Sequence, residues 1–291
     1  MLMILDQIIS GLSIGCIYAL VGIGYSLIFA SISLLHLAQG SLLTISGVIG
    51  LILMARLKLP FSGLVPVVAF ILACVGFLLE RFIYRNVKGS PTVGVISTLG
   101  VNITIPNLVI ILWGSEAYAF PKSVLGGSPF NLFGYAVQPV YYWIFIVVTI
   151  VVITLSVSLK YTNIGLAIRA TAYNPSLASL MGMNTSVTHS LSFAIGSALA
   201  GIAGLLAGKI LFITYDMGSV IGIKGFVAAV IGGFGNLPGA FLGGLILGVL
   251  ETIGGGIVSS TYKDSISFVI MIIMMIFLPA GLLGERRIEK V

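Results

Sequence analysis

The chain has 291 residues, of which 58% are hydrophobic and only 8% are charged. A soluble domain carries about 25% charged residues, so this composition excludes an ordinary soluble domain, and lipid must solvate much of the surface. The net charge of +6 comes from basic residues in short segments between apolar runs. That distribution sets orientation in a membrane and does not predict nucleic-acid binding.

The apolar runs are about 20 residues long, which is the length of a membrane-spanning helix, and they lack the alternation of a barrel strand. The 37 glycines are typical of membrane helices that pack closely. Cys16 and Cys74 lie inside apolar runs and are interpreted as small hydrophobic side chains. We expect one all-α domain over residues 1–291, a polytopic integral membrane protein with about eight transmembrane helices plus broken or re-entrant segments.

The first apolar run extends from Gln7 to about Leu35 and is followed by the polar sequence HLAQGS. Polar side chains between two membrane segments are costly in lipid. Two explanations stand equally: the chain reaches a membrane surface here, or the helix breaks inside the protein. In the second case His36, Gln39 and Ser41 face a cavity and are candidates for a translocation path.

The third span is expected from about Phe61 to Phe82, before a turn rich in basic residues. The positive-inside rule places this turn, with Arg85 and Lys88, in the cytoplasm. Glu80 and Arg81 are expected to lie at the membrane interface and not in a buried site.

The fourth span, about Thr92 to Trp113, contains Asn102 and Pro106. Proline predicts a kink where neighbouring helices satisfy the freed backbone groups. Asn102 faces either a translocation path or another helix. The loop from Glu116 to Gln138 then falls outside the cell by alternation.

The fifth span, Val140 to Leu159, returns the chain to the cytoplasm, where Lys160 to Ser186 form an unusually long polar break of some 27 residues. We expect a pair of short amphipathic helices there, the second starting at Asn174, because Asn caps a helix and Pro suits its first position. Ala178 and Gly182 are four residues apart, which predicts a small-residue face for a partner's groove. A plain surface loop is the alternative.

The sixth span is expected from about Val187 to Gly208, with Lys209 to Lys224 outside. The stretch from Gly225 to Glu251 is too long for one span and too short for two, so its number of crossings stays open. Its centre carries Gly, Asn236 and Pro, which predicts a short or re-entrant helix, a tight turn and a full span. The last span, about Ile266 to Phe277, precedes a cytoplasmic ERRIEK tail.

No enzyme site is apparent. His36 and His189 have no carboxylate neighbours in sequence, and no phosphate-binding loop or metal-ligand spacing occurs. The predicted spans are nearly free of charge, although transporters that couple to ions usually carry charges there. We therefore expect no cofactor on this chain, and transport energy has to come from a partner acting at the cytoplasmic break.

Four segments together resemble the permease subunits of ABC importers for branched-chain amino acids and related small polar solutes. They are GLSIGCIYALVGIGYSLIF, HLAQGSLL, IRATAYNPSLASLMGMN with the SFAIGSALAGIAGLLAG that follows it, and GFVAAVIGGFGNLPGAFLGGLILGVLE with the terminal LPAGLLG. The resemblance covers essentially the whole chain.

The resemblance implies that residues 160–186 are the cytoplasmic coupling loop that docks on an ATPase, through Arg169, Ala170, Asn174, Ala178, Gly182 and Asn184. It also implies an inner-membrane location and a second, related permease subunit. Two cytoplasmic ATPases would use ATP and Mg, and an extracytoplasmic binding protein would deliver the solute.

The sequence departs from the family pattern at His36, where Asn is usual, and at Gln39, where His is usual. Leu278 replaces a common Arg before Pro279. The first departure leaves the substrate open, so a permease for urea or short-chain amides is an alternative to one for branched-chain amino acids. A channel that works alone is a further alternative, but it leaves the long cytoplasmic break unexplained.

Overall fold

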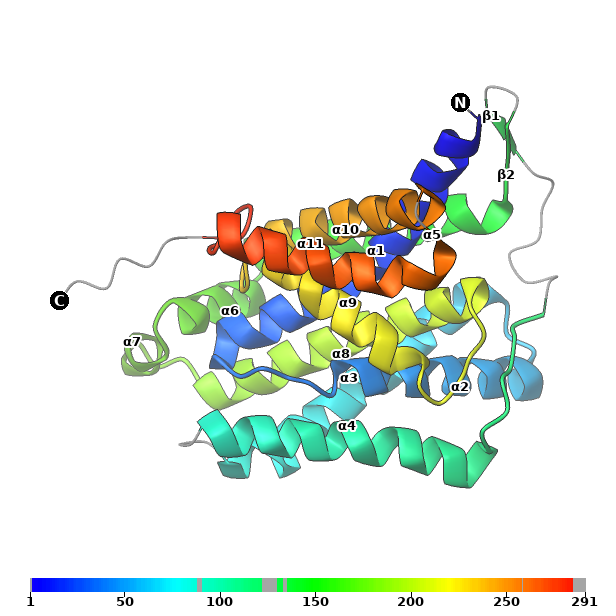
Figure 1. The fold of residues 1–291 in the computed structure, drawn as a ribbon. Coiled ribbons are helices and arrows are strands. Elements are labelled where there is room, and N and C mark those ends of the chain that lie inside the picture. Colours follow the sequence, from blue (N-terminus) through cyan, green and yellow to red (C-terminus); the bar gives the residue numbers. More distant parts are fainter. Residues whose placement is uncertain (1, 88–90, 122–129, 133–134, 258, 285–291) are drawn as a thin grey trace.

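The computed structural model describes the chain apart from residues 1, 88–90, 122–129, 133–134, 258 and 285–291. Helices make up most of it (Figure 1). The α-helices are α1 (Leu2–Ile32), α2 (Gln39–Leu57), α3 (Phe61–Phe82), α4 (Pro91–Trp113), α5 (Pro139–Tyr161), α6 (Asn163–Tyr173), α7 (Pro175–Leu180), α8 (Thr185–Ile210), α9 (Met217–Gly232), α10 (Leu237–Ile257) and α11 (Lys263–Phe277). Two 3-10 turns, η1 (Tyr84–Val87) and η2 (Ser260–Tyr262), follow α3 and α10. The strands β1 (Phe130–Leu132) and β2 (Tyr135–Val137) pair antiparallel.

Seven of the described helices are long and apolar enough to cross a membrane: α1, α2, α3, α4, α5, α8 and α10. Helix α9 is apolar but has only 16 residues. The chain is therefore an all-α, multi-pass membrane protein, as predicted, with one small hairpin added to the loop before α5. Helix α4 continues through Pro106 without a break.

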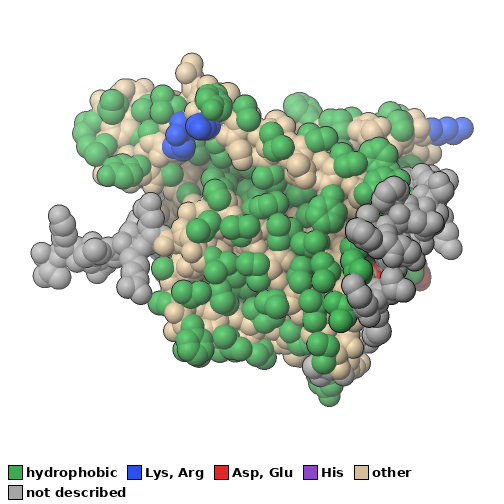
Figure 2. Space-filling view, turned by 90° about the horizontal axis from the view of Figure 1, so that it is seen from above, with side chains coloured by type: hydrophobic (Ala, Val, Ile, Leu, Met, Phe, Trp, Pro, Cys, Tyr) green, Lys and Arg blue, Asp and Glu red, His purple; other side chains and the backbone are tan. Residues whose placement is uncertain are grey.

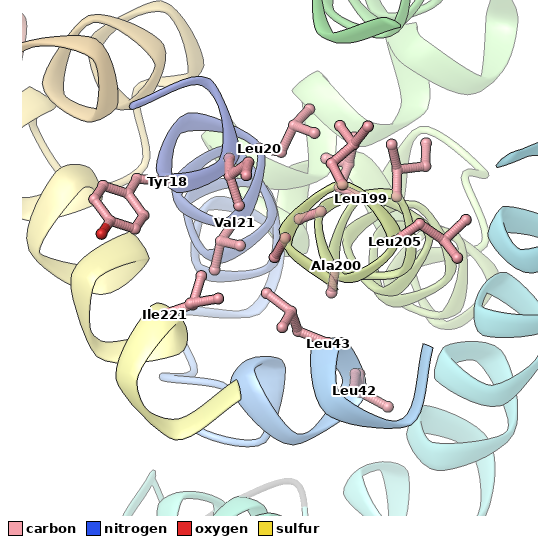
Figure 3. Packing of buried hydrophobic residues seen from close by; sticks show 14 of the residues in the cluster. Tyr18, Leu20, Val21, Leu42, Leu43, Leu199, Ala200, Leu205 and Ile221 are labelled. Atoms are coloured by element: carbon pink, nitrogen blue, oxygen red, sulfur yellow. The ribbon is translucent and has the colours of Figure 1, made fainter. Parts of the chain in front are cut away.

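Helices α1 and α8 form the centre of the bundle. Leu20 and Val21 of α1 interlock with Leu43 of α2 and with Leu199 and Ala200 of α8 (Figure 3). The outer helices instead turn large apolar side chains outward, and one face of the molecule is broadly hydrophobic (Figure 2). This arrangement is expected where lipid replaces water as the solvent.

Helices α1 and α10 touch backbone to backbone. A Cβ atom added to Gly15 would lie 2.8 Å from the Gly244 carbonyl oxygen, and one added to Gly11 would lie 2.9 Å from that of Gly248. A Cβ on Gly244 would overlap the backbone of Ala19. Only glycine permits this approach, which explains why these runs are rich in glycine.

The stretch from Gly225 to Glu251 reverses direction at its centre. Helix α9 ends at Gly232, residues 233–236 turn, and α10 packs back against α9. Gly233 and Gly235 have positive φ angles of 103° and 89°, which glycine adopts without strain. The predicted tight turn is confirmed: the chain passes along α9, turns, and returns along α10. The ERRIEK tail lies outside the described residues.

Helices α6 and α7 lie at one end of the bundle, and the β1–β2 hairpin lies at the other (Figure 1). The Arg85 turn belongs to the α6–α7 end, because its guanidinium Nη2 donates to the Ser186 carbonyl, 3.3 Å away, just after that segment. The basic turn and the polar break thus share one end of the bundle, as the predicted topology requires. Lys88 lies outside the described residues.

Candidate functional site

The polar break folds into the two short helices α6 and α7, as predicted. Thr162 caps α6 by accepting a hydrogen bond from the Gly165 amide, 3.0 Å away. Asn174 caps α7 by accepting from the amides of Ser176 and Leu177 at 3.0 and 3.1 Å, and Pro175 occupies the first position. These caps satisfy amide groups that a helix leaves free at its start.

The α6–α7 segment is fixed to the bundle along one side. Ile168 of α6 is buried against Leu27 of α1 and Leu159 of α5. The Arg169 guanidinium donates to the Lys160 carbonyl, 3.2 Å away. A displacement of this segment therefore bears directly on α1 and α5.

The structure corrects the predicted small-residue docking face. Ala178 is 3% exposed and points into the protein, whereas Gly182 lies beyond the end of α7 with a φ of 82°. The two residues do not share an exposed face, because the helix stops between them. Ala170 is half-buried, and Asn184 caps α8 by accepting from the Val187 amide at 3.2 Å.

Large apolar side chains occupy the exposed side of the segment instead. Tyr173 is 88% exposed, Leu180 83% and Met181 79%, and Leu177 is half exposed. Such a group of exposed apolar side chains marks an interaction site. The sequence pattern favours small residues as the docking face and does not predict these four, because it does not show which side of each short helix faces the bundle.

Hydrogen bonds from an ion pair at the end of α3 fix the start of α8 to the Arg85 turn. Glu80 is fully buried and pairs with Arg85 at 3.1 Å, and Ser190 donates a short hydrogen bond to Glu80. Arg85 also donates to the Ser190 hydroxyl at 2.9 Å. The predicted interfacial position of Glu80 is therefore wrong. The carboxylate lies inside the protein, where Arg85 and the distant Ser190 satisfy its charge. Arg81 is exposed.

The HLAQGS break lies inside the protein, which favours the second of the two explanations. His36 is 1% exposed and packs edge-on against the rings of Tyr84 and Phe193, with centroids 5.3 and 4.9 Å away. The Gln39 amide donates to the Gly196 carbonyl at 2.7 Å, and Ser41 donates to the Ala38 carbonyl at 2.8 Å.

A cavity of about 240 Å³ is bounded by α1, α2, α4 and α9 and includes Asn102 in its wall. Gly40 is part of the same wall, but His36, Gln39 and Ser41 are not. Asn236 also lies elsewhere: its amide donates to the Leu283 carbonyl at 2.7 Å, and its carbonyl oxygen accepts from the Gly239 amide at 2.9 Å. Asn102 is thus the one predicted path residue that this cavity includes.

An ionic cluster with buried Lys224 and Glu251 at its centre occupies the junction of α1, α9, α10 and α11. The Lys224 ammonium lies 2.9 Å from the Glu251 carboxylate and 2.6 Å from that of Asp264. Glu251 also accepts from the Ser267 hydroxyl at 2.8 Å and from the Tyr18 hydroxyl at 3.3 Å. Lys263 completes the cluster, 3.5 Å from Glu251.

The ionic cluster corrects two predictions. Lys224 is 4% exposed within α9 and does not end an outer loop, and the helical interior is not nearly free of charge. The 27-residue separation of Lys224 and Glu251 hid the pair in the sequence. Its members are mutually paired, which is the arrangement expected of buried charges.

Comparisons with known proteins agree along the whole chain. Residues 7–277 match the family described as branched-chain amino acid transport system, permease component. The chain is 35% identical to a high-affinity branched-chain amino acid transport system permease protein, LivH, of Salmonella typhimurium, over 99% of this chain and 97% of the relative. It is 34% identical to LivH of Escherichia coli K12 over 99% and 97%. It is likewise 34% identical to BraD of Pseudomonas aeruginosa, which carries the same description, over 99% and 98%.

The family match and the alignments with these relatives each cover nearly the whole chain and not a single shared motif. They agree with the seven candidate membrane spans. The chain belongs to the family of permease components of branched-chain amino acid transport systems.

Proposed function

We propose that this chain is a membrane-spanning subunit of an ATP-driven importer that carries branched-chain amino acids across the inner membrane. Its family and the printed descriptions of LivH and BraD support this substrate. Separate cytoplasmic ATPases hydrolyse ATP with Mg, a second related permease completes the path, and an extracytoplasmic binding protein delivers the solute.

The observation that carries the coupling role is the exposed apolar side of the α6–α7 segment. Tyr173 of α6, Leu180 of α7 and the following Met181 are exposed. Helices α6 and α7 lie at the end of the bundle (Figure 1) that the positive-inside rule predicts to be cytoplasmic. Aromatic and long apolar side chains of this kind serve as anchors in a partner's pocket. We assign this surface as the contact with the ATPase, in place of Ala178 and Gly182.

Movement of the α6–α7 segment reaches the bundle by two contacts. Ile168 carries it to α1 and α5, and the Arg85–Ser190 hydrogen bond joins the start of α8 to the end of α3. When ATP closes the ATPases, the segment shifts and rocks the glycine-rich helices between outward-open and inward-open states.

The test is ATP-dependent uptake of labelled leucine by proteoliposomes that contain both permeases, both ATPases and the binding protein. We expect uptake to require all components. Uptake that persists without the ATPases would establish a channel instead. Uptake of urea or a short-chain amide, but not of leucine, would establish the alternative substrate class.

The docking assignment is tested by Leu180→Glu and Met181→Glu, with Thr261→Glu as a control at the exposed η2 turn on the opposite end. We expect the first two variants to lose co-purification with the ATPase while still inserting into the membrane. Normal co-purification of both would reject the assignment.

A further inference from the structure

The cavity beside Asn102 is placed where two helices begin. Gly40 is the second residue of α2, and Gly218 and Ser219 are the second and third residues of α9. All three line the cavity. The two helix starts touch, because a Cβ atom on Gly40 or on Gly218 would overlap the backbone of the other.

The start of α2 offers free backbone donors. No side chain caps it, and the amide groups of Gly40 and Ser41 have no hydrogen-bond partner among the described residues. Amide groups of a first turn point back along the helix axis, here toward Leu37, which also lines the cavity. The helix dipole adds partial positive charge at this point, which favours an anion.

The side chain of a buried tyrosine independently points to a ligand in the cavity. Tyr25 is 4% exposed and lines the cavity, and its hydroxyl oxygen would lie 3.8 Å from a Cβ atom on Gly222, another wall residue. This hydroxyl has no hydrogen-bond partner among the described residues. Buried tyrosine hydroxyls usually have one. A ligand in the cavity would supply it.

The remaining wall combines few polar groups with apolar ones. Asn102 and Ser219 can donate hydrogen bonds, and Leu99, Ile223 and Phe226 provide apolar surface. None of the residues that line the cavity is charged. The wall thus offers donors for an anion and no carboxylate for an ammonium group.

We propose that this cavity binds the carboxylate of a small aliphatic acid during passage, with the carboxylate at the start of α2 and the side chain against the apolar wall. The proposal rests on the proposed function and deepens it. Recognition here depends on the carboxylate and not on the ammonium group. Leucine and its keto acid, 4-methyl-2-oxopentanoate, should therefore both bind, and leucinamide should not.

The experiment uses the assembled complex of both permeases and both ATPases, with Cys74 of this chain replaced by Ser and with Ile223→Cys. Ile223 lines the cavity and is 48% exposed, and its replacement leaves every polar group of the wall in place. We measure the rate at which a water-soluble maleimide labels the new thiol. We expect leucine and 4-methyl-2-oxopentanoate to slow labelling and leucinamide to have no effect.

Tyr25→Phe in the same background should raise the half-protecting concentration of leucine about five- to tenfold, the usual worth of one hydrogen bond. Tyr84→Phe is the matched control, because Tyr84 is equally buried and lies outside the cavity wall. We expect it to leave protection unchanged.

Protection by leucinamide equal to that by leucine would overturn the proposal. So would a lack of protection by either acid, an unreactive thiol in both the nucleotide-free and ATP-bound complexes, or equal effects of the two tyrosine variants. If the complex without these substitutions, supplied with the binding protein and ATP, imports no leucine, the proposed function fails. If it imports leucine and the protection results are negative, only the assignment of this cavity fails.

Discussion

Lys224 of α9 and Glu251 of α10 form an ion pair at 2.9 Å, and their side chains are 6% and 1% exposed. Glu251 holds further bonds from Tyr18 and Ser267, so one carboxylate joins α1, α9, α10 and α11. Removing Lys224 leaves the buried Glu251 carboxylate with only the more distant and partly exposed Lys263 ammonium at 3.5 Å. A poorly compensated buried charge costs far more than the pair itself contributes.

Lys224→Met should therefore destabilise the purified protein by about 3–5 kcal/mol. The double variant Lys224→Met, Glu251→Gln should recover part of this loss, because the buried carboxylate charge is removed together with its partner. Unfolding in detergent, followed by circular dichroism, measures both. Asp264→Asn is the control: its side chain is 62% exposed, and we expect a much smaller effect. An unchanged stability of Lys224→Met would contradict the predicted role.

Gly244→Ala and Gly100→Ala should have opposite consequences. A Cβ on Gly244 would overlap the Ala19 backbone, whereas one on Gly100 has nothing within 4 Å. The first change should separate α1 from α10 and greatly reduce the yield of folded protein. The second should stabilise α4 by up to about 1 kcal/mol, since alanine suits a helix better than glycine. Size-exclusion profiles and thermal unfolding distinguish these outcomes, and a normal yield for Gly244→Ala would be inconsistent with the packing.

Asn174→Ala should weaken α7 by about 1 kcal/mol, because two amide groups lose their acceptor. We expect reduced binding of the ATPase with unchanged insertion of the subunit. Asn174→Asp keeps an acceptor oxygen and serves as the matched control. Amide hydrogen exchange of residues 176–180 measures the local effect, and equal exchange in the two variants would reject it.

His36→Phe should maintain or increase stability. The ring is buried between Tyr84 and Phe193, and neither ring nitrogen has a hydrogen-bond partner among the described residues. Replacing an unsatisfied polar group by an apolar one of similar shape is neutral or favourable. Thermal unfolding and leucine uptake are measured together. Retained folding with lost uptake would show that the imidazole itself is needed for transport.

Local signals in the sequence predicted much of the fold. The expected bounds of α3 agree with the structure, because a proline before it and a basic turn after it mark its ends. The start of α7 also followed from two adjacent residues, Asn174 and Pro175. Each of these signals acts within one turn of helix, so no tertiary information is needed to interpret it.

The errors concern residues whose burial depends on helices that are distant in the sequence. The sequence predicts Lys224 and Glu80 near the membrane surface because charge is costly in lipid, but each is paired inside the protein. Likewise, the sequence predicts Ala178 on an exposed face, although α7 turns it inward. Which side of a short helix faces the bundle depends on packing against other helices, which composition does not encode.

The cavity was only partly foreseen. Asn102 was a candidate because it is polar within a span, but Tyr25 and Ser219 gave no comparable signal. Their importance arises from position, since the starts of two helices meet beside them.

The exposed side of the α6–α7 segment also affects the fate of an unassembled subunit. Tyr173, Leu180 and Met181 would meet water in a newly made copy that has no partner. Exposed apolar side chains of this kind are what chaperones and proteases recognise. The surface would thus limit the lifetime of orphan subunits and tie the amount of this protein in the cell to the supply of its partners.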